Sequence, residues 1–218
     1  MGELESFAES LGPIMESHYG RVFDIVVTPD EGQKSVANSR YNLIPHTDDP
    51  YQDTPPGIIF FHCLMANDDG SGQSIFVDGF QIAEVLRREK PSAFYLLCHY
   101  ELSFHKQYDE QIDMQAYSPV ISLDRRGNLI GVRISNLFAA PFDLPEEIVE
   151  PFYAAYRKLM QLYTDPKYLL KVELRPGDMV IFDNHRILHG RTEIGMQQQR
   201  HLRWCAMPRD YLHSALQL

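Results

Sequence analysis

Seven short apolar runs, rich in residues that favour strands and separated by proline and glycine, constrain the fold of this chain most strongly. They span residues 21–27, 57–64, 74–77, 117–123, 129–134, 168–174 and 179–182, and each predicts a β-strand. Residues 125–128 predict a hairpin turn between two of these strands. Because the runs do not alternate regularly with helices, we expect a mostly β fold with flanking helices, arranged as a double-stranded β-helix, or jelly roll.

Two segments have the spacing of amphipathic helices. The first spans about 79–90, with Asp78 placed to cap its start and Pro91 following its end. The second spans 145–163, where apolar residues recur at helical spacing and Asp143 is placed to cap the start. We expect the second helix to cover one face of a sheet.

Composition excludes several classes of protein. A chain of 218 residues with 44% hydrophobic content is expected to form a single domain over residues 1–218, and no apolar run is long enough to cross a membrane. A net charge of −10 without a basic stripe disfavours nucleic-acid binding. Three widely spaced cysteines without a C-x-x-C pair, and the lack of a leader-like opening segment, favour a reducing cytoplasm.

An H-x-D motif is the first candidate for a metal site. On extended chain, residues two apart point to the same face, so His46 and Asp48 can hold one ion together. The chain has nine histidines and many acidic residues, so this motif needs a second half to be informative.

The second half lies in segment 177–191, where an apolar strand runs into a polar stretch that ends in His189 and Gly190. Two imidazoles and one carboxylate are the ligands that iron(II) oxygenases use, because three positions on the metal stay open. A zinc pair formed by His185 and His189 on a helix is the alternative. It is disfavoured because no Glu follows His185 and the preceding residues alternate as in a strand.

Arginines near the C-terminal end of the chain are candidates for binding an acidic cosubstrate. Arg200 follows His189 at a distance suited to the next strand of the same sheet, and its planar guanidinium suits a carboxylate. Arg203 should face elsewhere, whereas Arg191 stays a competitor for the role.

Taken together, these motifs resemble the γ-butyrobetaine hydroxylase and trimethyllysine dioxygenase group of the taurine dioxygenase-like oxygenases. The resemblance covers about residues 11–207. It includes Tyr19-Gly20-x-x-Phe23-Asp24, His46-Thr47-Asp48-x-Pro50-Tyr51, Pro56-Gly57-x-x-x-x-His62-Cys63, Val77-Asp78-Gly79-Phe80, Pro176-Gly177-Asp178 and Phe182-Asp183-Asn184-x-Arg186-x-Leu188-His189-Gly190-Arg191.

The resemblance implies a dioxygenase that uses Fe(II), 2-oxoglutarate and O2 to hydroxylate, or otherwise oxidise, an unactivated C–H bond, with release of succinate and CO2. It places the iron on His46, Asp48 and His189, and 2-oxoglutarate on Arg200 and Ser74. The expected substrate is a small amine, betaine or amino acid, and the positions expected to contact it are Tyr19, Phe23, Tyr51 and Asn136. Asn38 and Ala206 stand where this group has aromatic residues that surround a quaternary ammonium.

Two rival interpretations remain open from the sequence. One is a non-catalytic jelly-roll subunit that binds a ligand or a partner, and the other is a cupin-like metal enzyme that needs no cosubstrate. The resemblance implies an upstream region that this sequence does not include. We therefore expect a short natural member, a fragment, or a subunit whose exposed sheet edge a second copy or a partner chain covers.

Overall fold

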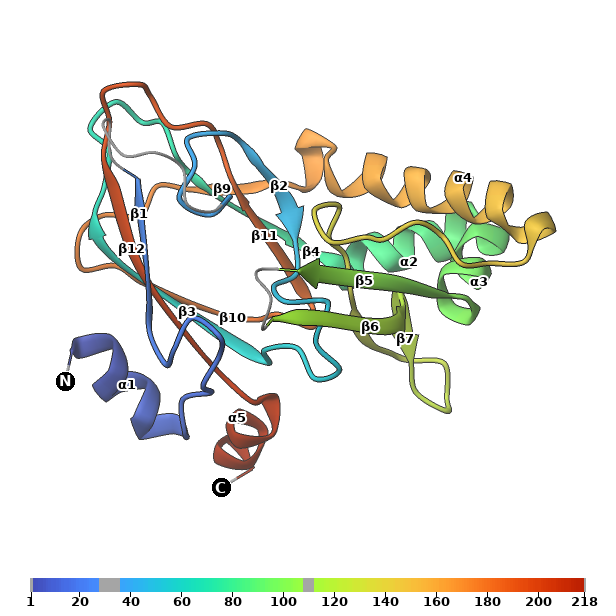
Figure 1. Cartoon of the computed structure of the whole chain (residues 1–218), viewed down its shortest axis with the longest axis horizontal. Helices are drawn as coiled ribbons and strands as arrows, with labels where there is room; N and C mark the ends of the chain where they lie inside the picture. The colour runs from blue at the N-terminus through green and yellow to red at the C-terminus, as the bar shows by residue number, and fades with distance from the viewer. Residues whose placement is uncertain (1, 28–35, 108–111, 218) are drawn as a thin grey trace.

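The computed structural model describes residues 2–27, 36–107 and 112–217. Two four-stranded antiparallel sheets form its centre (Figure 1). The first sheet has the order β1 (Phe23–Val27), β12 (Arg200–Met207), β3 (Ile58–Met65) and β10 (Met179–Asp183). The second has the order β2 (Leu43–His46), β11 (Ile187–Arg191), β4 (Ser74–Asp78) and β9 (Leu170–Val172).

An apolar layer joins the two sheets. Phe76 of β4 packs in this layer against Phe182 of β10, with ring centroids 5.5 Å apart, and Leu202 and Trp204 of β12 belong to the same cluster. Side chains alternate between the faces of a strand, so Ile75 and Val77 point away from this layer. The two facing sheets confirm the predicted jelly roll.

Helices pack against part of each sheet (Figure 1). Ile75 and Val77 pack in one large core, whose helical members come from α2 (Gly79–Glu89), α3 (Pro91–His99) and α4 (Glu146–Tyr163). On the first sheet, α1 (Glu3–Leu11) and α5 (Arg209–Leu216) pack in a separate cluster against β3 and β12. Part of the outer face of the first sheet stays exposed at Asp24 and Arg203, and a cavity opens between the two sheets.

A pair of hairpins extends the fold beside the sheets. The first joins β5 (Glu101–Gln107) to β6 (Asp113–Pro119), and the second joins β7 (Ile121–Leu123) to β8 (Leu129–Val132). A short 3-10 turn (Pro166–Tyr168) connects α4 to β9. No helix in the described ranges is long and apolar enough to cross a membrane.

Several predicted elements differ from the structure. The strand expected over 117–123 is two strands, because Pro119 has no N–H to continue the β5–β6 ladder and the chain turns at Val120 to pair with β8. Asp78 caps α2 as predicted, accepting from the N–H groups of Phe80 and Gln81. Asp143 does not cap α4, whose N-cap is Pro145 without a side-chain bond.

Candidate active site

Two adjacent strands bring the H-x-D motif next to His189. His46 of β2 and His189 of β11 are direct partners across the antiparallel ladder, and their ring centroids lie 4.6 Å apart. Asp48 follows two residues after His46. Its Oδ1 lies 3.5 Å from Nε2 of His46 and 3.6 Å from Nε2 of His189. These separations are too long for strong hydrogen bonds, so the three donor atoms border a common space.

The donor set fits an iron(II) ion. One ligand atom from each of His46, Asp48 and His189 lies within 4.8 Å of the other two. Two imidazoles and a carboxylate on one side of an ion leave positions free for a bidentate acid and for dioxygen. Over the ranges that the structure describes, this is the one group of three or more such residues close enough to hold a metal ion.

Neighbouring groups fix the orientation of these ligands. Nδ1 of His46 lies 2.9 Å from the carbonyl of Ile44, which directs Nε2 toward Asp48. The indole N–H of Trp204 donates to Oδ2 of Asp48 at 3.2 Å and leaves Oδ1 facing the histidines. Gly190 allows β2 to come close to β11, because a Cβ atom there would lie 2.4 Å from the carbonyl oxygen of Leu43.

Burial and mutual charge shift the titration of all three ligands. Burial raises the pKa of Asp48, but the charge of His189, the charge and polar contact of His46 and the hydrogen bond from Trp204 outweigh it and lower the pKa to about 2. Burial lowers the pKa of His189 to about 4. Burial also opposes the charged form of His46, but Asp48 prevails and raises the pKa of that imidazole.

A cavity of about 300 Å³ opens beside the three ligands. Arg200 lies on β12 of the first sheet, so its predicted place in the same sheet as His189 is wrong. It borders the cavity, is almost fully buried, and donates from Nη2 to the hydroxyl of Ser74 at 3.1 Å. Burial lowers the pKa of Arg200 to about 10, which leaves the guanidinium charged at neutral pH. Ser74 lies two residues, or roughly 7 Å, along β4 from Phe76, and Phe76 pairs with His189. One small molecule can therefore reach both the ligands and Arg200.

The other two arginines have different partners. The guanidinium of Arg191 is buried and donates to backbone carbonyls of Ala37, Ser39 and Tyr41, so it holds the segment before β2 in place. Arg203 points to the exposed side of its sheet and pairs with Asp24. Of the three candidates, Arg200 is the one whose side chain contacts Ser74 at the cavity.

His185 lies in the turn between β10 and β11, away from the three ligands. It borders a much smaller cavity with Thr47 and Arg133. The strand at His189 and this separation leave no H-x-x-x-H pair on a helix, so the zinc interpretation does not fit.

The residues expected to contact substrate divide into two groups. Tyr19 and Phe23 border the cavity, with ring centroids 4.6 Å apart. Tyr51 does not border the cavity, because it is buried and donates its hydroxyl proton to Asp49. Asn136 does not border the cavity, because its side-chain oxygen accepts from the hydroxyls of Tyr156 and Tyr163 on α4.

Sequence reasoning missed three residues that shape the site. Trp204, the single tryptophan of the chain, is marked by no motif of the sequence, yet it contacts Asp48. Asn184, seen only as part of a motif, bonds to the backbone of Asp48. Lys106 borders the cavity from β5. The alternation of buried Leu102, Phe104 and Lys106 along that strand was a signal that could have revealed it.

Solved structures share this fold. The asparagine oxygenase solved in complex with Fe(II), 2S,3S-3-hydroxyasparagine and succinate superposes with a TM-score of 0.74 at 21% identity, over 93% of this chain and 62% of that chain. The non-heme iron oxygenase OrfP, solved with Fe and alpha-ketoglutaric acid, gives 0.70 at 16% identity, over 95% and 63% of the two chains. At these identities the likeness shows the jelly-roll fold.

Curated relatives are closer in sequence. The chain is 37% identical over 216 residues to the gamma-butyrobetaine dioxygenase of Pseudomonas sp. (strain AK-1), and the match covers 99% of this chain and 55% of that relative. It is 35% identical over 196 residues to the trimethyllysine dioxygenase of Meyerozyma guilliermondii, over 88% and 48%. The chain thus spans about half the length of these relatives. The family model described as taurine catabolism dioxygenase TauD, TfdA family matches residues 1–206, and the chain belongs to that family.

Proposed function

We propose that this chain is the catalytic domain of an Fe(II)- and 2-oxoglutarate-dependent dioxygenase that hydroxylates a small amine, betaine or amino-acid-like substrate and releases succinate and CO2. One observation carries the proposal. His46, Asp48 and His189 converge beside a cavity that also contains the buried, charged guanidinium of Arg200. A metal enzyme that needs no acidic cosubstrate would have no use for Arg200 in this position.

Each side chain then has a defined part. His46, Asp48 and His189 would hold iron(II), and Arg200 with Ser74 would hold the far carboxylate of 2-oxoglutarate. When bound, iron(II) with 2-oxoglutarate supplies the activation of dioxygen that an unactivated C–H bond requires. Phe76 pairs with the metal ligand His189, and Ser74 lies roughly 7 Å from Phe76 along β4. This separation suits the length of a five-carbon diacid.

The rest of the cavity orients substrate and excludes water. Its walls are mostly apolar and include Phe23, Phe61 and Phe76. In such surroundings the charged groups at the ligands and at Arg200 act more strongly than in water. Tyr19 and Phe23 lie on the wall where we infer that the substrate binds.

An anaerobic titration tests the function. Iron(II) and then 2-oxoglutarate are added to the purified chain, and the weak visible absorption of the iron–oxoacid chelate is recorded. We expect the band in the wild type and in His185→Ala, and its loss in His189→Ala at unchanged melting temperature. A folded wild type that gives no band contradicts the proposal and favours a non-catalytic binding subunit.

Two further proposals concern the cellular compartment of the chain and the protein that covers its sheet edge. All three cysteines are free thiols, and Cys63 and Cys205 are buried, which supports a reducing compartment such as the cytoplasm.

The edge strands β9 and β10 expose Leu170 and Ile181, so we infer that a second copy or a partner chain covers a sheet edge. Analytical ultracentrifugation of the chain tests the second-copy form, which a monomer at micromolar concentration contradicts.

A further inference from the structure

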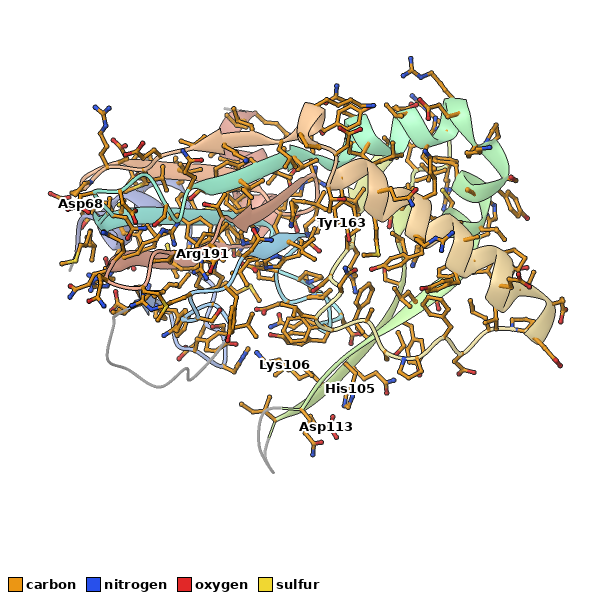
Figure 2. All side chains as sticks on the ribbon, turned by 90° about the horizontal axis from the view of Figure 1, so that it is seen from above. Asp68, His105, Lys106, Asp113, Tyr163 and Arg191 are labelled. Atoms are coloured by element: carbon orange, nitrogen blue, oxygen red, sulfur yellow. The ribbon has the colours of Figure 1, made fainter. Side chains whose placement is uncertain are left out.

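Lys106 places a cation at the wall of the cavity. It lies on β5, where the side chains of Leu102, Phe104 and Lys106 alternate inward and the neighbouring His105 is exposed. Figure 2 shows Lys106 on the side of the hairpin that faces the sheets, with His105 and Asp113 turned away. Only 9% of Lys106 is accessible to solvent, and the residue borders the same cavity as the metal ligands and Arg200.

Three aromatic rings surround the Lys106 amine. The Nζ atom lies 4.6 Å from the ring centre of Tyr19, 5.0 Å from that of Tyr51 and 5.5 Å from that of Phe138. We call these three rings the aromatic cradle. The Nζ atom also donates to the hydroxyls of Tyr51, at 3.0 Å, and Tyr19, and it lies 2.9 Å from Nε2 of His18. A charged ammonium is attracted to the faces of aromatic rings at these distances, and it donates hydrogen bonds to phenol oxygens.

Burial lowers the pKa of Lys106, and the charges of Asp49 and Asp48 oppose that shift. The hydroxyl of Tyr51, which accepts from Lys106, donates its own proton to Asp49. Asp49 also accepts from the side chain of Gln52, so its two oxygens already have partners. The relay through Tyr51 fixes the ammonium in position.

An occupied cradle changes which substrate charge the cavity accepts. A betaine or a trimethylated lysine carries a quaternary ammonium, and proteins usually bind such a group in a cage of aromatic rings. In this chain the protein's own cation occupies that place. A second cation would be repelled at short range in a site of low polarity, whereas a carboxylate at the same wall would be attracted.

We propose that Lys106 is a specificity-determining residue, which excludes a quaternary ammonium from the aromatic cradle and selects a substrate whose end at this wall is a carboxylate. This inference rests on the proposed function and narrows its substrate class to carboxylic acids, amino acids among them. The named substrates of the relatives would need another orientation to bind here.

The test compares two probes of opposite charge and similar length, butyltrimethylammonium and pentanoate. Calorimetry measures their binding to the chain loaded with Mn(II), which supports no turnover, and with saturating 2-oxoglutarate, which occupies Arg200. The variants are Lys106→Met, which keeps the apolar stem without the charge, and Lys171→Met as a control on the exposed strand β9. Lys106→Gln replaces Lys106→Met if the latter melts early.

We expect pentanoate to bind the wild type about tenfold more tightly than Lys106→Met, and butyltrimethylammonium to show the reverse preference by about the same factor. Lys171→Met should match the wild type. Equal affinities in the wild type and the Lys106 variant, or tighter cation binding by the wild type, overturn the inference. If Mn(II) and 2-oxoglutarate do not bind at all, the proposed function fails, and the same two probes on the metal-free chain still decide the role of Lys106.

Discussion

The side-chain amide of Asn184 holds both backbone polar groups of Asp48. Its Oδ1 accepts from the Asp48 N–H at 2.8 Å, and its Nδ2 donates to the Asp48 carbonyl at 3.2 Å and to the Pro56 carbonyl at 2.9 Å. Asn184 is fully buried in the turn after β10. The turn that precedes the strand of His189 therefore also fixes the carboxylate ligand.

Replacing Asn184 by Ala should weaken the metal site without touching a ligand. Residues that orient ligands typically contribute about 10- to 100-fold to metal affinity, and the unpaired buried backbone groups should cost about 1–3 kcal/mol of unfolding free energy. Metal titration and denaturant unfolding measure the two effects. Asn128→Ala, in the exposed turn before β8, is the matched control and should leave metal affinity unchanged. Wild-type affinity in a folded Asn184→Ala protein contradicts the positioning role.

Substitutions of Arg200 and Arg191 should affect different properties, the first the affinity for 2-oxoglutarate and the second the stability of the fold. Arg200→Gln is expected to raise the dissociation constant of 2-oxoglutarate about 30-fold or more, because losing one partner of a buried charge pair costs about 2–5 kcal/mol. Metal binding alone should persist. Arg191→Gln should instead lower the unfolding free energy by about 2–4 kcal/mol, since three backbone carbonyls lose their donor. Arg203→Gln serves as control, and an unchanged 2-oxoglutarate affinity in Arg200→Gln would move the role elsewhere.

Metal affinity should fall as the pH is lowered, with His46 as the proton acceptor. A ligand must lose its proton to bind, and the pKa of His46 is raised because Asp48 outweighs the effect of burial. Affinity is therefore full above that pKa and should drop by about tenfold per pH unit below it. His189, with a pKa of about 4, is already neutral in this range. Manganese titrations across pH test this, with His201→Gln as the control, and a flat profile would exclude His46 as the site of protonation.

The metal site could be predicted from sequence because its ligands lie in two short motifs at strand ends. The period of two in extended chain brings His46 and Asp48 to one side, and the run before His189 indicates a strand. The pairing of β2 with β11 then places the two histidines opposite each other. Strand pairing was not predicted, but the chemistry of the donor set required the ligands to meet.

The substrate wall could not be predicted in the same way. Lys106 comes from a strand that the pattern did not reveal, and its position depends on how the β5–β6 hairpin packs beside the sheets. The motif at Asn136 identified a residue type but not its direction, which the hydroxyls of Tyr156 and Tyr163 determine. The helices α1 and α5 were also missed, since each is short and needs the outer face of the first sheet to be stable.

Gly190→Ala should damage the site through the backbone alone. A Cβ atom at Gly190 would lie 2.4 Å from the carbonyl oxygen of Leu43 and 3.0 Å from the nitrogen of Pro45, so β2 must move away from β11. Because that pairing sets His46 against His189, we expect a loss of metal affinity of at least about tenfold, together with overpacking that costs about 1–3 kcal/mol of unfolding free energy.

The matched control for this change is Gly131→Ala on β8, where the nearest atom to an added Cβ is 3.8 Å away. That variant should stay within about 0.5 kcal/mol of the wild type and bind metal normally. Metal titration and thermal unfolding of both variants provide the comparison. If Gly190→Ala bound metal as tightly as Gly131→Ala, β2 would not need its close approach to β11, and the spacing of the two histidines would have to be set by Asp48 and its contacts with Asn184 and Trp204 instead.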